Sequence, residues 1–302
     1  MEKVKNKKKI SKKTVVFILV TLAPAVLHLL IFWAGVQIQT FVMAFTDQRT
    51  GQFTLYGNFV TVIKSLLSSD GVFPLAEAFR NTFIFFAVQL IMMPLTIFAA
   101  YMLYKKMAGS AVLRVILYLP GAVSSIMMAL VYQQLMMSDG PIVYFLNDIL
   151  HLGLNVPFIT ESPLALIITY DVWIGLGGGL IIWLGAMSRI PTDVLEYGRL
   201  DGIGTVREFI NIVVPLIWPT FVTMMTLALI GIFNSTGSVL IFTEGQYGTY
   251  TINYLFYDIV YKGETTEFNF SAALGLILTV ATIPIVVGGR AFMNKFGSAE
   301  EY

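Results

Sequence analysis

Long apolar segments alternate with shorter polar ones along the whole of this 302-residue chain. The apolar segments are centred on residues 15–42, 82–104, 113–136, 163–187, 216–242 and 270–293. Each is long enough to cross the roughly 30 Å hydrocarbon core of a bilayer as a helix. The pattern predicts an all-α, polytopic membrane helix bundle with six transmembrane helices, in keeping with a composition that is 57% hydrophobic and 12% charged.

Positively charged residues lie mostly on one side of these predicted spans. Fifteen of the 19 lysines and arginines are on that side, namely Lys3, Lys5, Lys7, Lys8, Lys9, Lys12, Lys13, Lys105, Lys106, Arg114, Arg189, Arg199, Arg207, Arg290 and Lys295. The opposite loops carry Arg49, Lys64, Arg80 and Lys262. Because loops rich in Lys and Arg stay in the cytosol, we expect a basic cytosolic N-terminus at 1–14, a transmembrane domain at 15–293 and a cytosolic C-terminus at 294–302 of a multi-pass cytoplasmic-membrane protein.

The polar segment 188–215 lies between the fourth and fifth spans. Its charged residues are Arg189, Asp193, Glu196, Arg199, Asp201, Arg207 and Glu208. Placing each of them in hydrocarbon would cost about 2.5–3.5 kcal/mol, so the segment is expected to lie in water. Asp193 with Glu196, and Thr205 with Glu208, have the spacing of capping boxes, which predicts two short helices separated by a bend at Gly202 and Gly204.

A few polar residues fall inside the predicted spans and are candidates for lining a cavity. Asp171 in the fourth span has Gly175, Gly178 and Gly179 near the same helical face, and Asn234 and Ser235 interrupt the fifth span. The glycines also form a GxxxG pattern, and the polar groups could equally bond a neighbouring helix. Cavity lining and helix packing therefore both remain open.

Several kinds of chemistry lack support in the sequence. There is no cysteine, the two histidines are isolated, and no phosphate-binding G-x-x-x-x-G-K-[ST] motif occurs, so neither metal binding nor ATP hydrolysis is predicted for this chain. The N-terminal lysines are expected to orient the first span and to meet anionic lipid rather than nucleic acid. That span is too long for the apolar part of a secretory signal and has no cleavage site, so it is expected to be retained.

The segments predicted to lie outside, 43–81, 137–162 and 243–269, are longer than the tight internal turn at 105–112. The last of them is rich in tyrosine and phenylalanine. Such rings could face a ligand or a partner protein, or they could form an interfacial aromatic belt. The sequence favours neither.

The segment 188–215 resembles the EAA motif of permease subunits of binding-protein-dependent ABC importers. Residues that match this motif in type and order are Glu196, Asp201, Gly202, Phe209, Ile212 and Pro215. RNTFIFF at Arg80–Phe86, LYLPGAVSS at Leu117–Ser125, SDGPIVYFLN at Ser138–Asn147 and FTEG at Phe242–Gly245 resemble the sugar-importing, maltose-type branch of type I importers. Tyr197, Gly198 and Ile203 stand where the motif has alanine.

The resemblance implies a permease that pairs with a second permease subunit, binds an ATPase dimer and receives a carbohydrate, expected to be an oligosaccharide, from an extracellular binding protein. ATP and Mg²⁺ would bind the ATPase subunits, with no cofactor on this chain. Glu196 and Asp201 would anchor segment 188–215 to the ATPase, and Tyr197, Gly198, Gly202 and Phe209 would form its contact surface. Asp171, Gly175, Asn234 and Ser235 would lie near the solute.

Two other functions compete with this interpretation. An intramembrane acid such as Asp171 can relay protons in a secondary transporter, although carriers of that class commonly contain two repeated halves and no second copy of segment 188–215 is visible. A membrane scaffold or receptor would need only regular packing of small residues. Neither alternative accounts for the EAA-like spacing.

Overall fold

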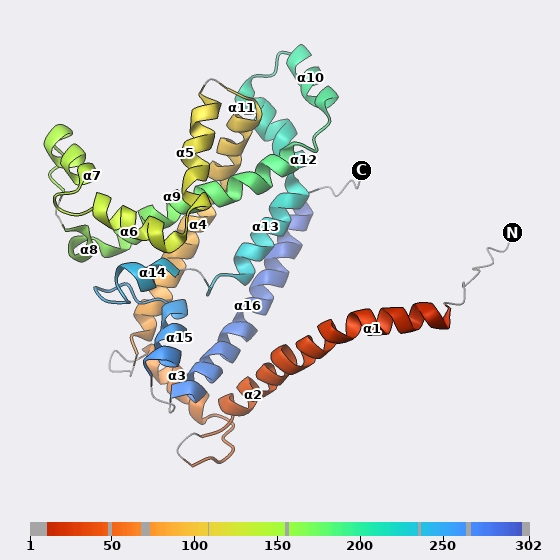
Figure 1. The fold of residues 1–302 in the computed structure, drawn as a ribbon, viewed down its shortest axis with the longest axis vertical. Coiled ribbons are helices and arrows are strands. Elements are labelled where there is room, and N and C mark those ends of the chain that lie inside the picture. Colours follow the sequence, from red (N-terminus) through yellow and green to blue (C-terminus); the bar gives the residue numbers. More distant parts are fainter. Residues whose placement is uncertain are drawn as a thin grey trace. The chain divides into compact units, whose positions relative to one another are not determined.

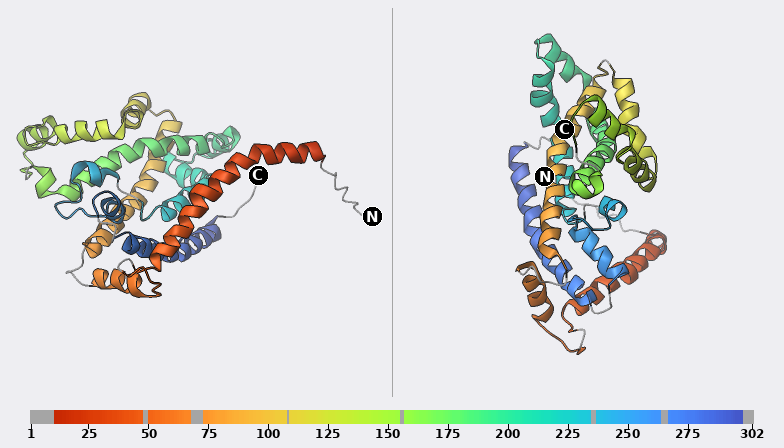
Figure 2. Two further views of the ribbon diagram at one scale, coloured as in Figure 1. Left: turned by 60° about the horizontal axis from the view of Figure 1, so that its bottom comes forward. Right: turned by 90° about the vertical axis from the view of Figure 1, so that its left-hand side faces the viewer.

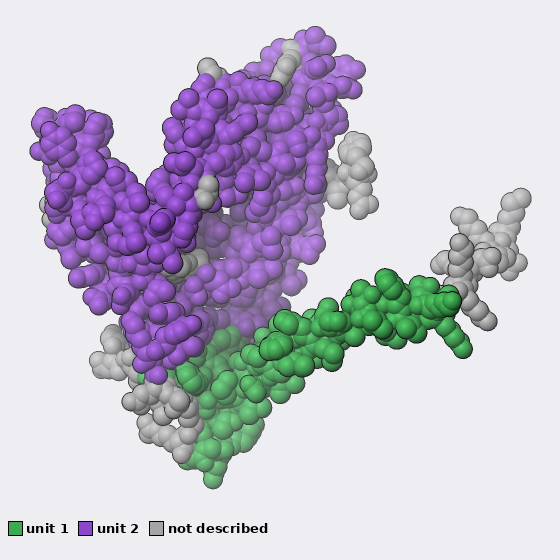
Figure 3. Space-filling model, viewed as in Figure 1, with its two compact units in different colours: residues 1–62, 264–277 green, residues 63–263, 278–302 purple. Residues whose placement is uncertain are grey.

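The structure is a computed structural model that describes residues 11–47, 50–67, 73–107, 109–154, 157–234, 237–263 and 267–297. Helices make up most of this described part, which contains no strand beyond an isolated bridge between Thr46 and Phe53. The chain divides into two compact units, residues 1–62 with 264–277 and residues 63–263 with 278–302 (Figure 3). The predicted all-α class is confirmed.

The first unit is dominated by its N-terminal helix. Helix α1 (Lys12–His28), a π-helical segment η1 (Leu29–Ala34) and α2 (Gly35–Ala44) form one apolar helix of 33 residues. Nearly all of its apolar side chains are exposed, as expected for a span that faces lipid or another membrane helix. At its end, the Asn269 side-chain amide donates a hydrogen bond to the carbonyl of Thr46 at 2.6 Å.

The second unit is built around α4 (Leu75–Tyr104) and α9 (Pro163–Met187), which pack along each other. Pro163 is at the start of α9, where its fixed φ suits the first turn and its missing N–H costs nothing. The predicted fourth span, 163–187, has the same bounds as α9. Other helices of this unit are α5 (Ser110–Ala122), α6 (Ser125–Leu135), α13 (Trp218–Ile230), α14 (Gly237–Phe242) and α15 (Ile252–Tyr261), with most of α16 (Phe268–Phe296) (Figures 1 and 2).

Within the described residues, the predicted spans are found as four long helices and two bent pairs of helices. The four long apolar helices are Lys12–Ala44, Leu75–Tyr104, Pro163–Met187 and Phe268–Phe296. Two further spans are bent pairs, Ser110–Gly121 with Ser125–Leu135 at 109° and Thr205–Leu216 with Trp218–Ile230 at 73°. Counting each pair as one span gives the predicted six.

The predicted bounds of the fifth span are wrong. One span over 216–242, interrupted at Asn234 and Ser235, was expected, but α13 ends at Ile230, a turn follows, and a separate short helix α14 begins at Gly237. The span starts earlier instead, within Thr205–Leu216. Pro219 lies in the first turn of α13, where a residue without an N–H is tolerated, and marks the bend.

The predicted external segments 43–81 and 137–162 contain short helices. These are α3 (Gly57–Leu67), α7 (Pro141–Tyr144), the π-helical segment η2 (Phe145–Ile149) and α8 (Phe158–Glu161). The remaining short elements belong to segment 188–215 and are described with the candidate site.

Gly177 is the point of closest approach between α9 and α5. A Cβ atom at this position would lie nearer to the backbone oxygen of Leu117 than real Cβ atoms come to any neighbour. At Gly178, by contrast, an added Cβ would meet nothing within 4 Å. Gly177 is therefore a helix-packing glycine outside the GxxxG pair; within that pair, a Cβ at Gly179 would lie 3.1 Å from the Thr96 side chain of α4, and one at Gly175 would meet nothing within 4 Å.

Replacing Gly177 with alanine is expected to lower the free energy of unfolding by about 1–3 kcal/mol, because the two helices must move apart. The matched variant Gly178→Ala should have little effect. Thermal unfolding of the purified protein in detergent measures both. Equal unfolding midpoints for the two variants would contradict this packing role.

Candidate functional site

Segment 188–215 forms two short helices that project from one end of the second unit (Figures 1 and 2). They are α10 (Thr192–Leu200) and α11 (Thr205–Glu208), and α11 leads through a π-helical segment η3 (Phe209–Val213) into α12 (Val214–Leu216). Gly202 has a φ of 71°, a conformation that glycine adopts without strain. The predicted pair of helices with a bend between them is confirmed.

The predicted capping boxes are not how these helices begin. Helix α10 starts at Thr192, so Asp193 lies inside its first turn rather than before it. The residue preceding α11 is Gly204, and no side chain caps that helix. The Thr205 capping box was wrong because Glu208 makes its bonds elsewhere.

Glu208 is buried against the C-terminal end of α4, the end that is expected to face the cytosol. Its side chain is 1% exposed, and one carboxylate oxygen pairs with Lys105 Nζ at 2.7 Å. The other oxygen accepts a hydrogen bond from the Tyr101 hydroxyl at 2.9 Å. The ammonium group of Lys105 also lies 5.6 Å from the centre of the Tyr101 ring, a cation–π arrangement.

Aromatic packing reinforces this attachment. The ring of Phe209 lies edge-on to Phe98, with centroids 5.2 Å apart, and 5.1 Å from the centroid of Tyr101. Leu195 and Val213 belong to the same buried cluster as Tyr101. Segment 188–215 is therefore fixed to α4 by both apolar and charged contacts.

The six residues predicted to couple to an ATPase divide into two groups. Glu196, Tyr197, Asp201 and Gly202 are exposed, and Tyr197 keeps 68% of its surface. Gly198 is buried, since a Cβ there would lie 2.8 Å from the end of the Ile212 side chain. Phe209 is half-buried against α4. Gly198 thus packs inside the segment and Phe209 packs between the segment and α4, behind the exposed surface.

The contacts of Glu208 with Tyr101 and Lys105 were not predicted from the sequence. Glu208 matches a capping pattern by spacing, and its actual partners lie more than 100 positions earlier in the chain. A lysine directly after an apolar span is normally assigned to orientation alone. The pairing could be found only once the fold brought both ends together.

A cavity of about 390 Å³ lies between α4, α9 and α13. It is lined by Phe85, Val88, Gln89, Met92, Met93, Thr96, Ile168, Asp171, Val172, Ile174, Gly175, Leu176, Gly179, Trp183 and Met224. The lining is mostly apolar, with an amide, a hydroxyl and a carboxylate among it. Such a cavity can take up a small or elongated solute with a few oriented polar contacts.

Two of the four predicted solute residues line this cavity, Asp171 and Gly175. The Asp171 carboxylate accepts a hydrogen bond from Ser238 Oγ at 2.6 Å, which joins α9 to α14. Asn234 is exposed outside the lining, and its backbone oxygen accepts a bond from the Asn253 side chain at 3.3 Å. Ser235 lies outside the described residues.

Sequence reasoning missed Gln89 and Thr96, the polar lining residues on α4, and Ser238, the partner of Asp171. An available signal for Gln89 was its position as an amide in an otherwise apolar span, the same signal that identified Asp171. Thr96 gave no such signal, because its hydroxyl bonds the carbonyl of Met92 within the helix, as threonines in apolar helices commonly do.

Polar side chains at the start of α4 hold the segment that follows α14. The Asn81 amide donates to the carbonyls of Gly248 and Tyr250 at 2.9 and 2.8 Å. The Thr82 hydroxyl oxygen accepts from the N–H of Ile252 at 3.0 Å. The sequence RNTFIFF thus has a structural role here, because Asn81 satisfies two carbonyls of the non-helical segment before α15 and Thr82 satisfies the first N–H of α15.

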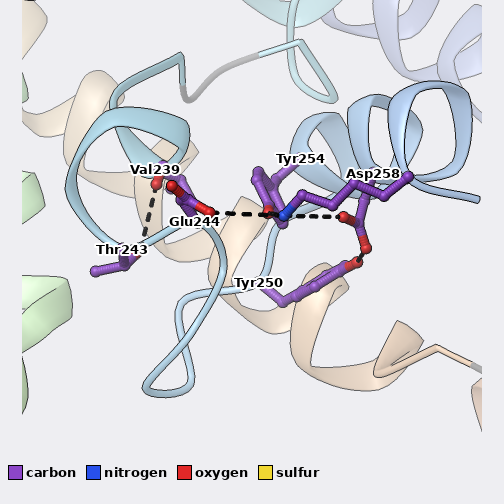
Figure 4. A network of polar contacts seen from close by, with 7 residues as sticks. Val239, Thr243, Glu244, Tyr250, Tyr254 and Asp258 are labelled. Carbon is purple, nitrogen blue, oxygen red and sulfur yellow. Dashed lines mark hydrogen bonds and ion pairs between the residues drawn. The ribbon is translucent and has the colours of Figure 1, made fainter.

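A second polar network lies within the aromatic-rich segment (Figure 4). Lys262 Nζ lies 3.7 Å from Glu244 and 3.5 Å from Asp258, and Asp258 accepts a hydrogen bond from the Tyr250 hydroxyl. A hydrogen bond to the Tyr254 hydroxyl raises the pKa of Lys262 above its usual value. Tyr254 is buried in this packing, whereas Tyr261 is 74% exposed.

Comparison with known proteins agrees with this architecture. The family of binding-protein-dependent transport system inner membrane components matches residues 92–298. The lactose transport system permease protein LacF of Rhizobium radiobacter is 25% identical over 288 residues, covering 92% of this chain and 92% of its own. The arabinooligosaccharides transport system permease protein AraP of Halalkalibacterium halodurans is 23% identical over 304 residues, covering 96% of this chain and 91% of its own. The chain spans 47% of the maltose/maltodextrin permease protein MalF of Photorhabdus laumondii, with 28% identity over 255 residues.

Solved structures show the same fold. A bacterial ABC transporter involved in the import of the acidic polysaccharide alginate contains a chain with a TM-score of 0.79 and 22% identity, covering 94% of this chain and 96% of that one. These relatives are components of transport systems rather than enzymes. Together with the match over residues 92–298, they show that this chain belongs to the family of binding-protein-dependent transport system inner membrane components, as the EAA-like spacing predicted.

Proposed function

We propose that this permease moves a carbohydrate, of the oligosaccharide class, into the cell as part of an ATP-driven importer. The observation that carries the proposal is that one helix, α4, both lines the cavity and holds segment 188–215. Such a helix can connect a cytosolic ATPase to a solute pathway. Relatives named for lactose, maltodextrin and arabinooligosaccharides support the substrate class.

Segment 188–215 would be the coupling loop. Glu196 and Asp201 would bind polar groups of an ATPase subunit, with Tyr197 and Gly202 beside them on the exposed surface. Gly198 and Phe209 would keep that surface in shape from within. ATP and Mg²⁺ would bind the ATPase dimer, and closure of that dimer would move the attached helices as rigid bodies and alternate access to the cavity.

The cavity would hold the solute during this change of access. Gln89, Thr96 and Asp171 supply groups that can bond sugar hydroxyls, and Phe85 and Trp183 supply flat apolar surface for sugar rings. Gly175 would leave room beside Asp171. Contact of the solute with Asn234 or Ser235 stays a prediction.

The remaining partners are those that the family implies. Residues 1–14 and 294–302 would be cytosolic, and 15–293 would form the permease domain. A second permease subunit would complete the pathway, lipid would cover the outer apolar surface, and an extracellular binding protein would deliver the sugar to segments such as 243–269. The family description includes binding-protein dependence, and a solved relative is described in complex with a saccharide-bound periplasmic protein.

Reconstitution tests this function. The chain, co-expressed with a second permease and an ATPase, is expected to co-purify with both and to take up neutral radiolabelled oligosaccharides into proteoliposomes when the binding protein and ATP are supplied. Vanadate should stop uptake and a protonophore should not. Uptake that resists vanadate but fails with the protonophore would instead support a proton-coupled carrier.

A further inference from the structure

We infer that Glu208, Tyr101 and Lys105 form a clamp that makes segment 188–215 and α4 move as one body. The inference deepens the proposed function and rests on it, since it identifies positioning residues through which an ATPase would reach the cavity. None of the three side chains lines the cavity, and none is among the exposed residues proposed to touch the ATPase. Their contribution would be to transmit movement.

The burial of the clamp indicates that it fixes the position of segment 188–215 relative to α4. A carboxylate that is 1% exposed is costly unless it is paired and hydrogen-bonded, and Glu208 has both kinds of partner. Apolar residues of similar volume often replace such a group without loss of stability, whereas breaking the pair strands a charge. A buried ion pair at this junction therefore fixes geometry more than it adds stability.

The clamp holds α11 at both ends. The Tyr101 hydroxyl lies 2.9 Å from Glu208 Oε1, at the end of α11, and 3.2 Å from the carbonyl oxygen of Thr205, at its start. Lys105 directly follows the end of α4 in a helical backbone conformation, four positions after Tyr101, so the two side chains lie on the same side of the helix end. A displacement of α11 therefore acts directly on one face of α4.

Helix α4 carries this displacement to the cavity. It is a single helix from Leu75 to Tyr104, and its residues Gln89, Met92, Met93 and Thr96 line the cavity. At 1.5 Å per residue, Thr96 lies about 8 Å and Gln89 about 18 Å along the axis from Tyr101. No proline lies between Thr96 and Tyr101, whereas Pro94 separates Thr96 from Gln89. A clamped α4 would therefore shift Thr96, at the near part of the cavity wall, together with the coupling loop.

Spin labels can measure whether the two elements move together, because the chain has no cysteine of its own. Cysteines would replace Val206 on α11 and Ile91 on α4, both exposed, in the purified complex with its ATPase. In the parent we expect the same narrow distance distribution without nucleotide and after trapping with ATP and vanadate. In Glu208→Gln the distribution should broaden, and sugar moved per ATP hydrolysed should fall about tenfold or more.

Further variants separate a positioning role from a loss of folding. Lys106→Met removes a neighbouring exposed charge and should match the parent in every measurement. The exchange Lys105→Glu with Glu208→Lys should narrow the distribution again and recover part of the transport. Where Glu208→Gln does not fold, Tyr101→Phe removes only the hydroxyl and should show a smaller change in the same direction.

Different results would contradict the proposed function and the clamp. A parent complex without ATPase would overturn the proposed function, whereas a clamp variant that keeps its ATPase, a narrow distance distribution and full transport per ATP would overturn the clamp alone. A charge-exchanged variant with neither a narrowed distribution nor recovered transport, despite normal folding, would also contradict it.

Discussion

Filling the cavity by replacing Gly175 with tryptophan is expected to reduce sugar transport by at least about tenfold while leaving the assembled complex intact. Gly175 lines the 390 Å³ cavity next to Asp171, and an added Cβ there would meet nothing within 4 Å. The bulky side chain can therefore enter the empty space without disturbing helix packing. It would occupy the volume that the sugar needs during passage.

Uptake into proteoliposomes measures this effect, and co-purification of the partner subunits shows whether assembly survives. The matched control is Gly178→Trp, three residues along the same helix, where an added Cβ would also meet nothing within 4 Å but which lies outside the cavity lining. Normal uptake by Gly175→Trp, with unchanged sugar preference, would remove the cavity from the solute pathway.

Reversing the charge of Glu196 is expected to weaken ATPase binding by about thirtyfold or more. Glu196 is exposed on α10, and a carboxylate that becomes buried against a cationic partner commonly loses 2–5 kcal/mol when the pair is broken, with each 1.4 kcal/mol worth about a factor of ten. Arginine at this position would add repulsion to that loss. The amount of ATPase that co-purifies, and the Kd for its rebinding, give the size of the effect.

Glu161→Arg serves as the control for this charge reversal. Glu161 is exposed on α8, in a segment expected to lie on the opposite side of the membrane. It should leave ATPase binding unchanged. If ATPase binding and sugar-stimulated hydrolysis are unaltered in Glu196→Arg, Glu196 does not contact the ATPase and has a role only within α10.

The hydropathy pattern predicts where helices lie in the sequence, but it does not predict how they bend. Helix α9 was predicted with the correct bounds because the apolar run 163–187 is flanked by polar residues at both ends. The bends of 109° and 73° were not predicted, because apolar length says nothing of direction. The bounds of the fifth span were misplaced because the predicted span 216–242 runs across the break that Asn234 and Ser235 mark, whereas α13 already ends at Ile230.

The candidate site was partly predictable. Polar residues in apolar spans led to Asp171, and motif spacing led to the exposed face of α10. Partners distant in sequence could not be found this way, as the pairing of Glu208 with Lys105 and of Asp171 with Ser238 shows. The glycine pattern likewise located a small-residue strip without revealing that Gly177 contacts α5 while Gly175 faces the cavity.

Cross-linking from the exposed tip of the coupling loop tests the central claim most directly. A cysteine in place of Tyr197, the only thiol in this cysteine-free chain, would carry a short photoactivatable cross-linker in the complex purified from membranes. The account predicts an adduct with the ATPase subunit, and protection of this thiol in intact cells from a membrane-impermeant reagent. Labelling from outside, or an assembled complex without an ATPase adduct, would contradict it.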